Sequence, residues 1–315
     1  MTKNQFITDV NAYLEAITPN YAESSMDEKR RKLRYHSNVM YYLYTSGRIG
    51  TCTPSRMSAE DLQEFVTYRR SAGVKDSTIA KDLSMIGMFL KWKGNDAYDI
   101  YKVQFGNRKP QYYSGKLEPL DDGVIDRVYA LARSTEDWKV LEGCVSVVLG
   151  CAAGLRPQES RQLYAHDVNL DGDRSTIYIQ HVKGEGRWGR RRSAPVMDGV
   201  EDILEKYLAM RSRRLEMLGM TSTAMFPPFR SDREFLTQQG FGRLKKPVED
   251  TLGVKFELRD GRRAYGQRLL DRGYALELVS ISMGHSTVET TQKFYANYRQ
   301  QKVLDDIFAM KNGGA

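Results

Sequence analysis

The stretch that decides the fold lies at residues 258–295. It reads LRDGRRAYGQRLLDRG at 258–273, then a short link, then MGHSTVETTQKFY at 283–295. The first part predicts a helix with Arg259 and Arg262 on one face, because residues three apart are neighbours on a helix. Arginine presents a planar fork of N–H groups that matches phosphate. This helix therefore predicts a binding site for a phosphate group.

The residues after this helix supply two further reactive groups. Gly273 ends the helix, and Gly284 with His285 opens a tight turn. The phenol of Tyr295 follows shortly after the imidazole, and tyrosine is a covalent nucleophile once it is activated. Two guanidiniums, an imidazole and a phenol are the groups needed to hold a phosphodiester and attack it.

The length and charge of the chain favour two domains and a polyanionic partner. At 315 residues the chain exceeds one ordinary domain, and 41% of apolar residues is enough to build real cores. The formal net charge of +8 favours a polyanion as partner. The alternative is a generally basic surface that has no bearing on function.

The sequence predicts a soluble protein of a reducing, cytoplasmic compartment. Charges and asparagine interrupt the N-terminus before a signal-peptide core forms, and the apolar stretch Gly143–Leu155 is too short to span a bilayer. Cys52, Cys144 and Cys151 lack the spacing of a metal site or a disulfide framework. We therefore expect buried free thiols.

The first hundred residues predict an all-helical domain. Helices are expected at Phe6–Ile17, at Tyr21–Tyr44, after a capping box at Ser58–Asp61, and from Asp76. The second of these carries a basic run at 29–34. Four short helices with basic faces suit a clamp that binds a groove. The alternative is a helical bundle whose charge run is a solvated face.

A linker is expected between two domains. Residues Gly94–Pro119 show no periodicity, contain several glycines and prolines, and include basic side chains. This composition predicts domains at 1–95 and 119–315, joined by a linker at 96–118. A basic linker between basic domains suits a chain that wraps a duplex, since counterion release would add affinity.

The second domain is expected to open with helices near Asp121–Arg133 and Trp138–Ala153. Arg156 follows a glycine break and precedes Pro157, which places its guanidinium beside a helix N-terminus, where anions are favoured. The alternative is a surface arginine, or one paired with Glu159. For Arg156 taken alone, this alternative is favoured.

A β-hairpin with a basic tip is expected next. Ser175–Val182 and Arg190–Val196 flank the glycine-rich sequence KGEGRWGR. Lys183 lies where the first strand enters the turn, from which it could reach a phosphate and deliver a proton. The alternative is a solvated lysine that protects a strand edge. Helices are expected to follow at Gly199–Met217 and Arg233–Thr251.

Taken in order, these motifs resemble those of the tyrosine recombinases, the phage-type integrases and Xer-like resolvases. The motifs are a Gly-Leu-Arg-x-x-Glu sequence at 154–159, a hairpin lysine, an arginine helix before Leu-Leu-Asp-Arg-Gly, then Gly-His-Ser and Thr-Thr-Gln-x-x-Tyr. The resemblance spans most of residues 1–311. It implies a mainly α fold with a small β-hairpin or sheet, arranged as a two-domain C-shaped clamp. A helical core-binding (SAM-like) domain would precede a mixed α+β catalytic domain.

The resemblance also implies the role of each site residue. Arg156 and Arg262 would clamp the scissile phosphate, and Lys183 would protonate the departing 5′ oxygen. His285 would form a hydrogen bond to the phosphate, and Tyr295 would attack it to form a 3′-phosphotyrosyl link. The intermediate keeps the bond energy, so no cofactor and no metal are implied, and the sequence contains no GxxxxGK[ST] loop.

Two positions depart from the family pattern. Arg259 stands where the family usually has a histidine, and arginine cannot accept a proton. We expect Arg259 to add positive charge at the phosphate, and His285, water or Asp260 to take the proton from the nucleophile. The second departure is spacing: Phe294 occupies the usual position of the tyrosine, and Tyr295 follows it. Tyr298 is the second candidate.

Three functions remain open from the sequence. The first is a DNA recombinase, the second a catalytically idle DNA-binding protein of the same fold, and the third a nicking enzyme similar to type IB topoisomerases. Double-stranded DNA sites are the expected partner, bound by a homo-oligomer, a tetramer on two sites, in the cytoplasm at the nucleoid. The tail 300–310 has one apolar face, which the family docks on a neighbouring subunit; packing on its own domain is the alternative.

Overall fold

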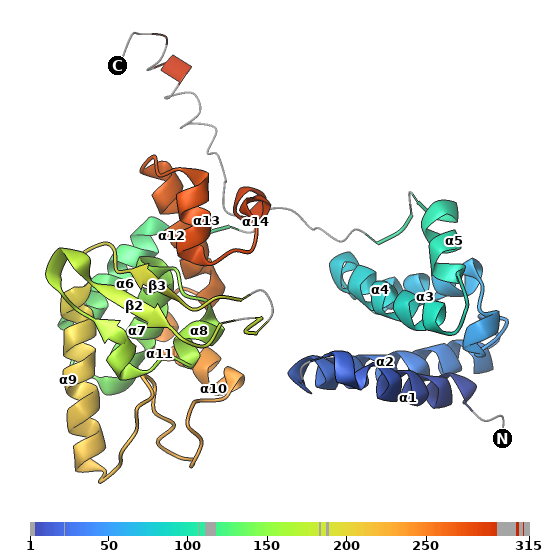
Figure 1. The fold of residues 1–315 in the computed structure, drawn as a ribbon, viewed down its shortest axis with the longest axis horizontal. Coiled ribbons are helices and arrows are strands. Elements are labelled where there is room, and N and C mark those ends of the chain that lie inside the picture. The colour runs from blue at the N-terminus through green and yellow to red at the C-terminus, as the bar shows by residue number, and fades with distance from the viewer. Residues whose placement is uncertain are drawn as a thin grey trace. The chain divides into compact units, whose positions relative to one another are not determined.

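The computed structural model describes residues 4–21, 23–106, 108–110, 118–182, 184–186, 189–294, 307, 308 and 311. The chain divides into two compact units, an N-terminal unit at Met1–Gly115 and a C-terminal unit at Lys116–Ala315 (Figure 1). Both units are mainly helical, and the C-terminal unit also contains a small sheet. The mainly α fold with a small β-sheet, expected from the sequence, is confirmed.

The N-terminal unit is a bundle of helices around one apolar core. Its helices are α1 (Gln5–Ile17), α2 (Glu23–Thr45), α3 (Ala59–Ser71), α4 (Asp76–Trp92) and α5 (Ala97–Gln104). The Ser58 side chain accepts from Asp61 N, and the Asp61 carboxylate accepts from Ser58 N, so the expected capping box is confirmed. Fully buried phenylalanines fill the core, namely Phe6, Phe65 and Phe89.

The prediction of an irregular linker from residue 96 is wrong at its start, because α5 occupies Ala97–Gln104. Ala97 and Tyr101 are both buried, and α5 packs against α3 and α4. Two buried residues four apart give too short a pattern to reveal a helix in sequence. A Cβ on Gly87 of α4 would lie 2.1 Å from Tyr98 Cδ1, so the absence of a side chain there allows this packing.

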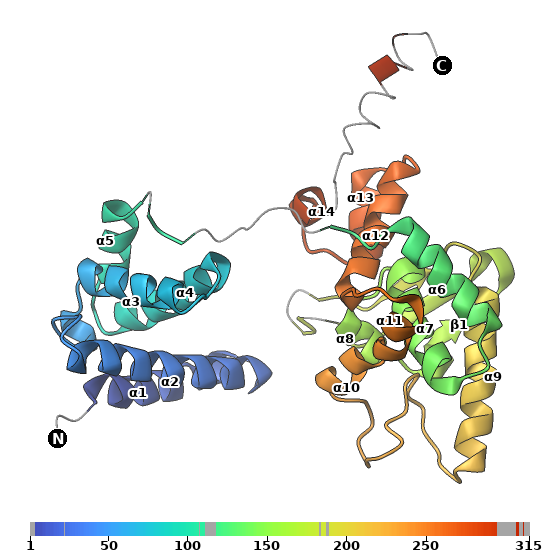
Figure 2. The same cartoon turned by 180° about the vertical axis from the view of Figure 1, so that it is seen from behind.

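The C-terminal unit is built around α7 (Trp138–Ala153), which contacts α6, α9, α11 and α12 (Figures 1 and 2). Every residue from Leu141 to Ala153 is buried. Cys144 and Cys151 are buried free thiols on this helix, as predicted. No helix in the described ranges has both the length and the apolar character needed to cross a membrane.

Most other elements of this unit pack around α7, whereas α13 packs on α12 and α14 packs on α13. The helices are α6 (Asp122–Ser134), α8 (Pro157–Arg161), α9 (Glu201–Met217), α10 (Gln238–Arg243), α11 (Lys246–Leu252), α12 (Leu258–Asp271), α13 (Leu276–Met283) and α14 (Val288–Phe294). One continuous helix at Arg233–Thr251 was a wrong prediction. The described helices there are α10 and α11, and the break between them fits Pro247, because proline disrupts a helix interior but suits a first turn.

The sheet has three antiparallel strands in the order β1 (Val168–Asn169), β2 (Thr176–Ile179) and β3 (Arg192–Pro195). Ile177 pairs with Ala194, and both are buried in the core around α7. The predicted hairpin is thus confirmed, since β2 and β3 are consecutive strands that pair antiparallel. Strand β1 was not predicted, because two residues carry no detectable alternation.

Helices α7 and α12 cross at two glycines. A Cβ on Gly261 would lie 2.8 Å from Cys151 Sγ, and a Cβ on Gly150 would lie 3.4 Å from Arg262 N. The two backbones therefore approach closely because neither helix has a side chain at the crossing. This crossing brings Arg262 to the end of α7, where Gly154 stands at φ +66° as the helix cap.

Candidate active site

Arg156 lies between two helices, after the glycine that caps α7 and before Pro157, which starts α8. Its Nη1 donates to Glu159 Oε1 at 2.7 Å, and its backbone N donates to Glu159 Oε2 at 2.8 Å. Its Nη2 donates to Gly284 O at 3.0 Å. The pairing with Glu159 that the sequence left open is thus present, and the same arginine also reaches the segment that carries His285.

Arg262 connects the ends of two helices from the first turns of α12. Its Nη1 donates to Gly154 O at the end of α7, and its Nη2 donates to Met283 O at 2.6 Å, at the end of α13. Nη2 also lies 3.0 Å from His285 Nε2. Only 3% of Arg262 is exposed, so this guanidinium is held in one place by its neighbours.

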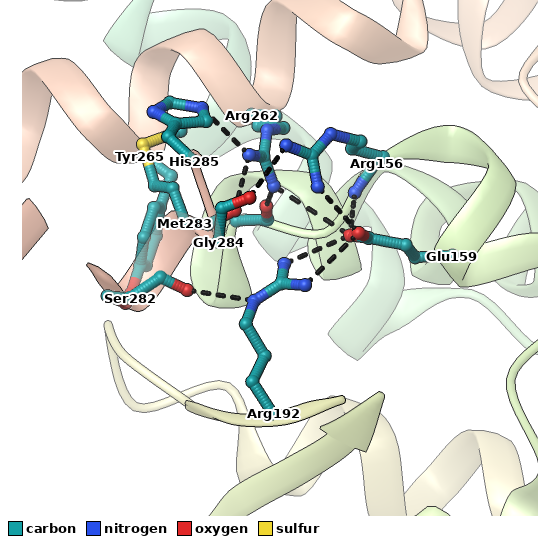
Figure 3. A network of polar contacts seen from close by, with 10 residues as sticks. Arg156, Glu159, Arg192, Arg262, Tyr265, Ser282, Met283, Gly284 and His285 are labelled. Atoms are coloured by element: carbon teal, nitrogen blue, oxygen red, sulfur yellow. Dashed lines mark hydrogen bonds and ion pairs between the residues drawn. The ribbon is translucent and has the colours of Figure 1, made fainter. Parts of the chain in front are cut away.

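A third arginine, Arg192 on β3, completes the cluster (Figure 3). Its Nη1 and Nη2 donate to the two carboxylate oxygens of Glu159 at 3.1 and 3.0 Å. Its Nε donates to Ser282 O at 3.1 Å. A Cβ on Gly284 would lie 2.8 Å from this guanidinium, so a glycine at 284 leaves the space that Arg192 occupies.

Three consecutive carbonyls at the C-terminal end of α13 thus accept from three different arginines. Ser282 O binds Arg192, Met283 O binds Arg262, and Gly284 O binds Arg156. The last carbonyls of a helix have no partner within the helix, and the helix dipole makes this end favourable for cations. The end of α13 therefore gathers the guanidiniums without neutralising their charge.

One carboxylate serves this cluster, and it is ionised. Burial raises the pKa of Glu159, but the hydrogen bonds and charges of Arg192, Arg262 and Arg156 outweigh that effect and bring the pKa to about 2. Three guanidiniums against this single carboxylate leave the cluster net positive at neutral pH. A surplus of positive charge with arginine donors suits an anion of the size of a phosphodiester.

His285 follows the glycine that caps α13, where Gly284 has a φ of +63°. Its backbone N donates to Ser280 O at 3.0 Å, and its Nδ1 lies 2.7 Å from Thr291 Oγ1 on α14. Burial, and after it the positive charges of Arg262, Arg156 and Arg192, lower the pKa of His285 to about 3. The imidazole is therefore neutral at physiological pH.

The structure brings together three of the six residues predicted for the site, Arg156, Arg262 and His285. Arg259 is exposed on α12, and no hydrogen bond or ion pair joins it to these three within the described part of the chain. Lys183 and Tyr295, together with the second candidate Tyr298, lie outside the described residues.

Asp260 was one of three candidates to take a proton from the nucleophile. Its carboxylate accepts from Glu257 N at 2.9 Å and from Arg263 Nη1, so it caps the start of its own helix. No His, Cys, Asp or Glu side chains of the described ranges gather in a group of three that could hold a metal ion.

Three residues of the site were not singled out from sequence, namely Glu159, Arg192 and Thr291. Glu159 was part of a motif and an alternative ion-pair partner of Arg156. Arg192 was part of the strand after the basic hairpin tip. Thr291 stood in the Thr-Thr-Gln motif without a role. A helix-starting glutamate, an arginine in a strand and a threonine in a helix are common in any protein. Their convergence depends on tertiary contacts that sequence patterns do not encode.

Comparisons with known proteins identify the family of this chain. Residues 124–302 match the model of the phage integrase family. The tyrosine recombinase XerD of Oceanobacillus iheyensis is 23% identical over 263 residues, which cover 82% of this chain and 85% of that relative. The resemblance drawn from the sequence motifs is confirmed by these matches.

Solved structures share the fold. The XerH site-specific recombinase bound to palindromic difH substrate, in a post-cleavage complex, gives a TM-score of 0.68 at 17% identity, covering 96% of this chain and 84% of that one. The Tn1549 transposon integrase in complex with transposon right end DNA gives 0.65 at 16% identity, covering 98% and 99%. Since the family match extends over more than half of the chain, the protein belongs to the phage integrase family, the tyrosine recombinases.

Proposed function

We propose that this tyrosine recombinase cuts and rejoins DNA at specific sites through a covalent link to Tyr295. The observation that carries the proposal is the convergence of Arg156 and Arg262 on the end of α13, beside a neutral His285. Guanidiniums that are held in place by neutral carbonyls keep their positive charge and can stabilise the negative charge of a scissile phosphate. Such preorganised donors are the main source of rate in phosphoryl transfer.

The chemistry follows from the groups and their expected roles. The Tyr295 hydroxyl attacks the phosphorus and loses its proton, a 3′-phosphotyrosyl bond forms, and the bond to the 5′ oxygen breaks. Lys183 supplies a proton to that oxygen, which leaves as a 5′ hydroxyl. A 5′ hydroxyl of the partner strand then attacks the phosphotyrosine and releases Tyr295. Each bond broken is replaced by one of the same kind, so the reaction needs no external energy source.

Arg259 adds positive charge near the phosphate in this proposal. Its position three residues before Arg262 supports this role, because residues three apart are neighbours on a helix. Arginine cannot accept a proton, so His285 or water takes the proton of the nucleophile. The test is an Arg259→His variant, whose cleavage rate and pH profile should both change. A variant with the wild-type rate and profile would remove Arg259 from the mechanism.

The chain acts on double-stranded DNA, and we propose that it does so as a tetramer on two sites. The DNA-bound structures of XerH and of the Tn1549 integrase support the DNA partner. The N-terminal and C-terminal units would hold opposite faces of the duplex as a C-shaped clamp, in the cytoplasm at the nucleoid. The apolar face of the tail 300–310 would dock on a neighbouring subunit. Salt-dependent self-association that persists after deletion of residues 300–315 would exclude this docking.

The decisive experiment uses a nicked suicide substrate that carries the attachment site, or genomic fragments when that site is unknown. Wild-type protein should give a protein–DNA adduct on a denaturing gel, and Tyr295→Phe should give none, while Tyr298→Phe retains it. Loss of the adduct only in Tyr298→Phe would identify Tyr298 as the nucleophile. Tight binding without any adduct would point to the catalytically idle alternative, which the named relatives, all recombinases, do not favour.

A further inference from the structure

The hydroxyl of Tyr35 is a surface group that a buried cation holds in place. Tyr35 lies on α2 and is 50% exposed, yet its hydroxyl oxygen accepts from Arg69 Nη1 at 2.7 Å. Arg69, on α3, is buried, and its Nη2 donates to the buried carboxylate of Asp82 on α4 at 3.0 Å. Three helices thus contribute one residue each to a line of side chains that leads from the interior of the N-terminal unit to its surface.

These contacts leave the proton of the Tyr35 hydroxyl available to a partner outside the unit. Arginine is only a donor, so the oxygen of Tyr35 accepts from Arg69 and keeps its own O–H. In the part of the chain that the structure describes, this hydroxyl donates to no acceptor. A hydrogen bond received from a cation polarises the hydroxyl and strengthens the bond that it donates. Tyr35 therefore presents an oriented donor at the surface of α2.

The surface around this hydroxyl suits a polyanion. Arg31, Asn38 and Tyr42 are exposed four residues before, three after and seven after Tyr35, so these side chains share one face of α2. The basic run at 29–34 adjoins this face, and the sequence has no aspartate or glutamate from 29 to 59. An anion that approaches this part of the helix therefore meets positive charge and hydrogen-bond donors without a competing carboxylate from the same segment.

We propose that Tyr35 donates a hydrogen bond to a backbone phosphate of the bound DNA, and that Arg69 is a positioning residue that orients this hydroxyl. The inference deepens the proposed function, since it names one contact of the N-terminal unit with the duplex. The acceptor is a phosphate because the neighbouring charged side chains of α2 are arginines and lysines, the usual partners of phosphate oxygens. A contact of this kind fixes the protein on the duplex and carries no sequence information.

Filter binding of the full-length protein tests the contact on two duplexes, one with the attachment site and one of unrelated sequence. Tyr35→Phe should weaken binding about tenfold on both, the effect of losing one hydrogen bond to a charged group. Tyr42→Phe is the matched control and should stay within about twofold. Tyr42 is 51% exposed on the same face, and no side chain in the described ranges donates to its hydroxyl.

Two results of this assay would overturn the proposal. A loss confined to the attachment-site duplex would mean that Tyr35 contacts a base and not a phosphate. Equal losses in Tyr35→Phe and Tyr42→Phe would mean that the contact with Arg69 gives the Tyr35 hydroxyl no advantage.

The salt dependence of binding separates this contact from damage to the helix. The phenol is neutral, so its loss should leave the slope of log affinity against log salt unchanged, because that slope counts the phosphates neutralised by cations. A variant that displaced α2 would also move its basic run away from the DNA and make the slope less steep. A less steep slope for Tyr35→Phe would therefore overturn the proposal in favour of a structural role.

Arg69→Lys tests the positioning role. Lysine keeps a positive charge beside Asp82, but its single ammonium group lacks the fork with which the guanidinium reaches both the carboxylate and the hydroxyl. Arg69→Lys should weaken DNA binding about three- to tenfold in the wild-type background and by less than about twofold in the Tyr35→Phe background. Equal losses in the two backgrounds would overturn the positioning role, since Arg69 would then act independently of Tyr35.

Failure of this inference is distinguishable from failure of the proposed function, because binding is measured without cleavage. The expected affinities in a protein that never forms an adduct would support the Tyr35 contact and contradict the proposed chemistry. A protein that forms the adduct, but whose Tyr35→Phe variant binds DNA like wild type, would support the chemistry and overturn the contact.

Discussion

A buried carboxylate surrounded by basic side chains lies in each unit of the molecule, Asp82 in the first and Glu159 in the second, and the two sites differ in what else holds the cations. In the N-terminal unit, Asp82 of α4 accepts from Arg69 Nη2 at 3.0 Å, with His36 Nε2 and Lys32 Nζ at 3.4 and 3.7 Å. Arg69 also donates to the hydroxyl of Tyr35 at 2.7 Å. These contacts join α2, α3 and α4, and all are made by side chains of the helices themselves.

In the C-terminal unit, Glu159 has the same role, but each of its arginines also donates to a main-chain carbonyl at a helix end. A carbonyl orients a guanidinium without cancelling its charge. The comparison teaches that buried basic clusters around an acid are not active sites by themselves. The site that suits catalysis is the one whose cations are oriented by neutral acceptors, which leaves positive charge for an anionic substrate.

The largest effect that sharpens this comparison is expected at Asp82. Asp82→Asn should lower the free energy of unfolding of the N-terminal unit by about 3–5 kcal/mol, because it leaves buried cations without their anion. Urea titration at pH 7 measures this loss. The control is Asp99→Asn, an exposed aspartate of α5 paired with Lys91 and Lys102, which should change stability little. A change at Asp82 no larger than that of the control would contradict a structural role for this cluster.

The next largest effect is expected on the rate of DNA cleavage. Arg262→Gln should lower the single-turnover rate of cleavage by about 10²–10³-fold, the cost of removing one preorganised donor from a transition state. DNA affinity should change much less, as a filter-binding assay would show. Arg263→Gln is the control, since the neighbouring Arg263 pairs with Asp260 at the helix start. Equal losses in the two variants would mean that the charge of α12 matters and the position of Arg262 does not.

Arg192→Gln should slow cleavage by about 10- to 100-fold, since it removes charged hydrogen bonds worth about 1.5–3 kcal/mol that hold Glu159 and the end of α13. Its control is Arg191→Gln, whose side chain pairs with exposed Glu185. A substrate with sulfur at the 5′ bridging position does not need a proton on its leaving group. If that substrate abolishes the defect, Arg192 acts through the protonation by Lys183 and not through the arginine cluster.

The smallest effect concerns a second buried acid of the same unit, Glu142 on α7. Burial raises its pKa from 4.5 to about 7, against a lowering effect of Arg214, whereas the pKa of Glu159 falls to about 2. A raised pKa in the folded state means that stability is lost as pH rises from about 4.5 through 7. Glu159 has the opposite sign, and its contribution is lost only as pH falls below about 4.5 toward 2.

Glu142→Gln should therefore stabilise the C-terminal unit at pH 8 by about 1–3 kcal/mol relative to the same change at pH 5. Urea unfolding at the two pH values measures the difference. Glu136→Gln, at an exposed glutamate just before α7, is the control and should show no such pH dependence. A pH-independent effect of Glu142→Gln would show that this carboxyl is not neutral in the folded protein.

Much of this architecture was predictable because it depends on local patterns. The helix at Trp138–Ala153 and the hairpin follow from apolar runs and turn residues, and the structure has both. Arg156, Arg262 and His285 were predicted because their motifs have a fixed order. The main-chain contacts that hold them were not predictable, since Ser282, Met283 and Gly284 contribute carbonyl oxygens, which every residue has. Arg192 was missed for the related reason that its partners are distant in sequence.

The crossing of α7 and α12 at Gly150 and Gly261 has a practical consequence for laboratory evolution of this recombinase. Because the two backbones touch there, the position of Arg262 is set by the main chain and not by the choice of surrounding side chains. Mutant libraries that aim at new target sequences can therefore vary exposed residues widely without shifting the chemistry. Gly261 is the first codon to keep constant, since a Cβ there would lie 2.8 Å from Cys151 Sγ, and Gly150 is the second, since a side chain larger than alanine would meet the backbone of α12.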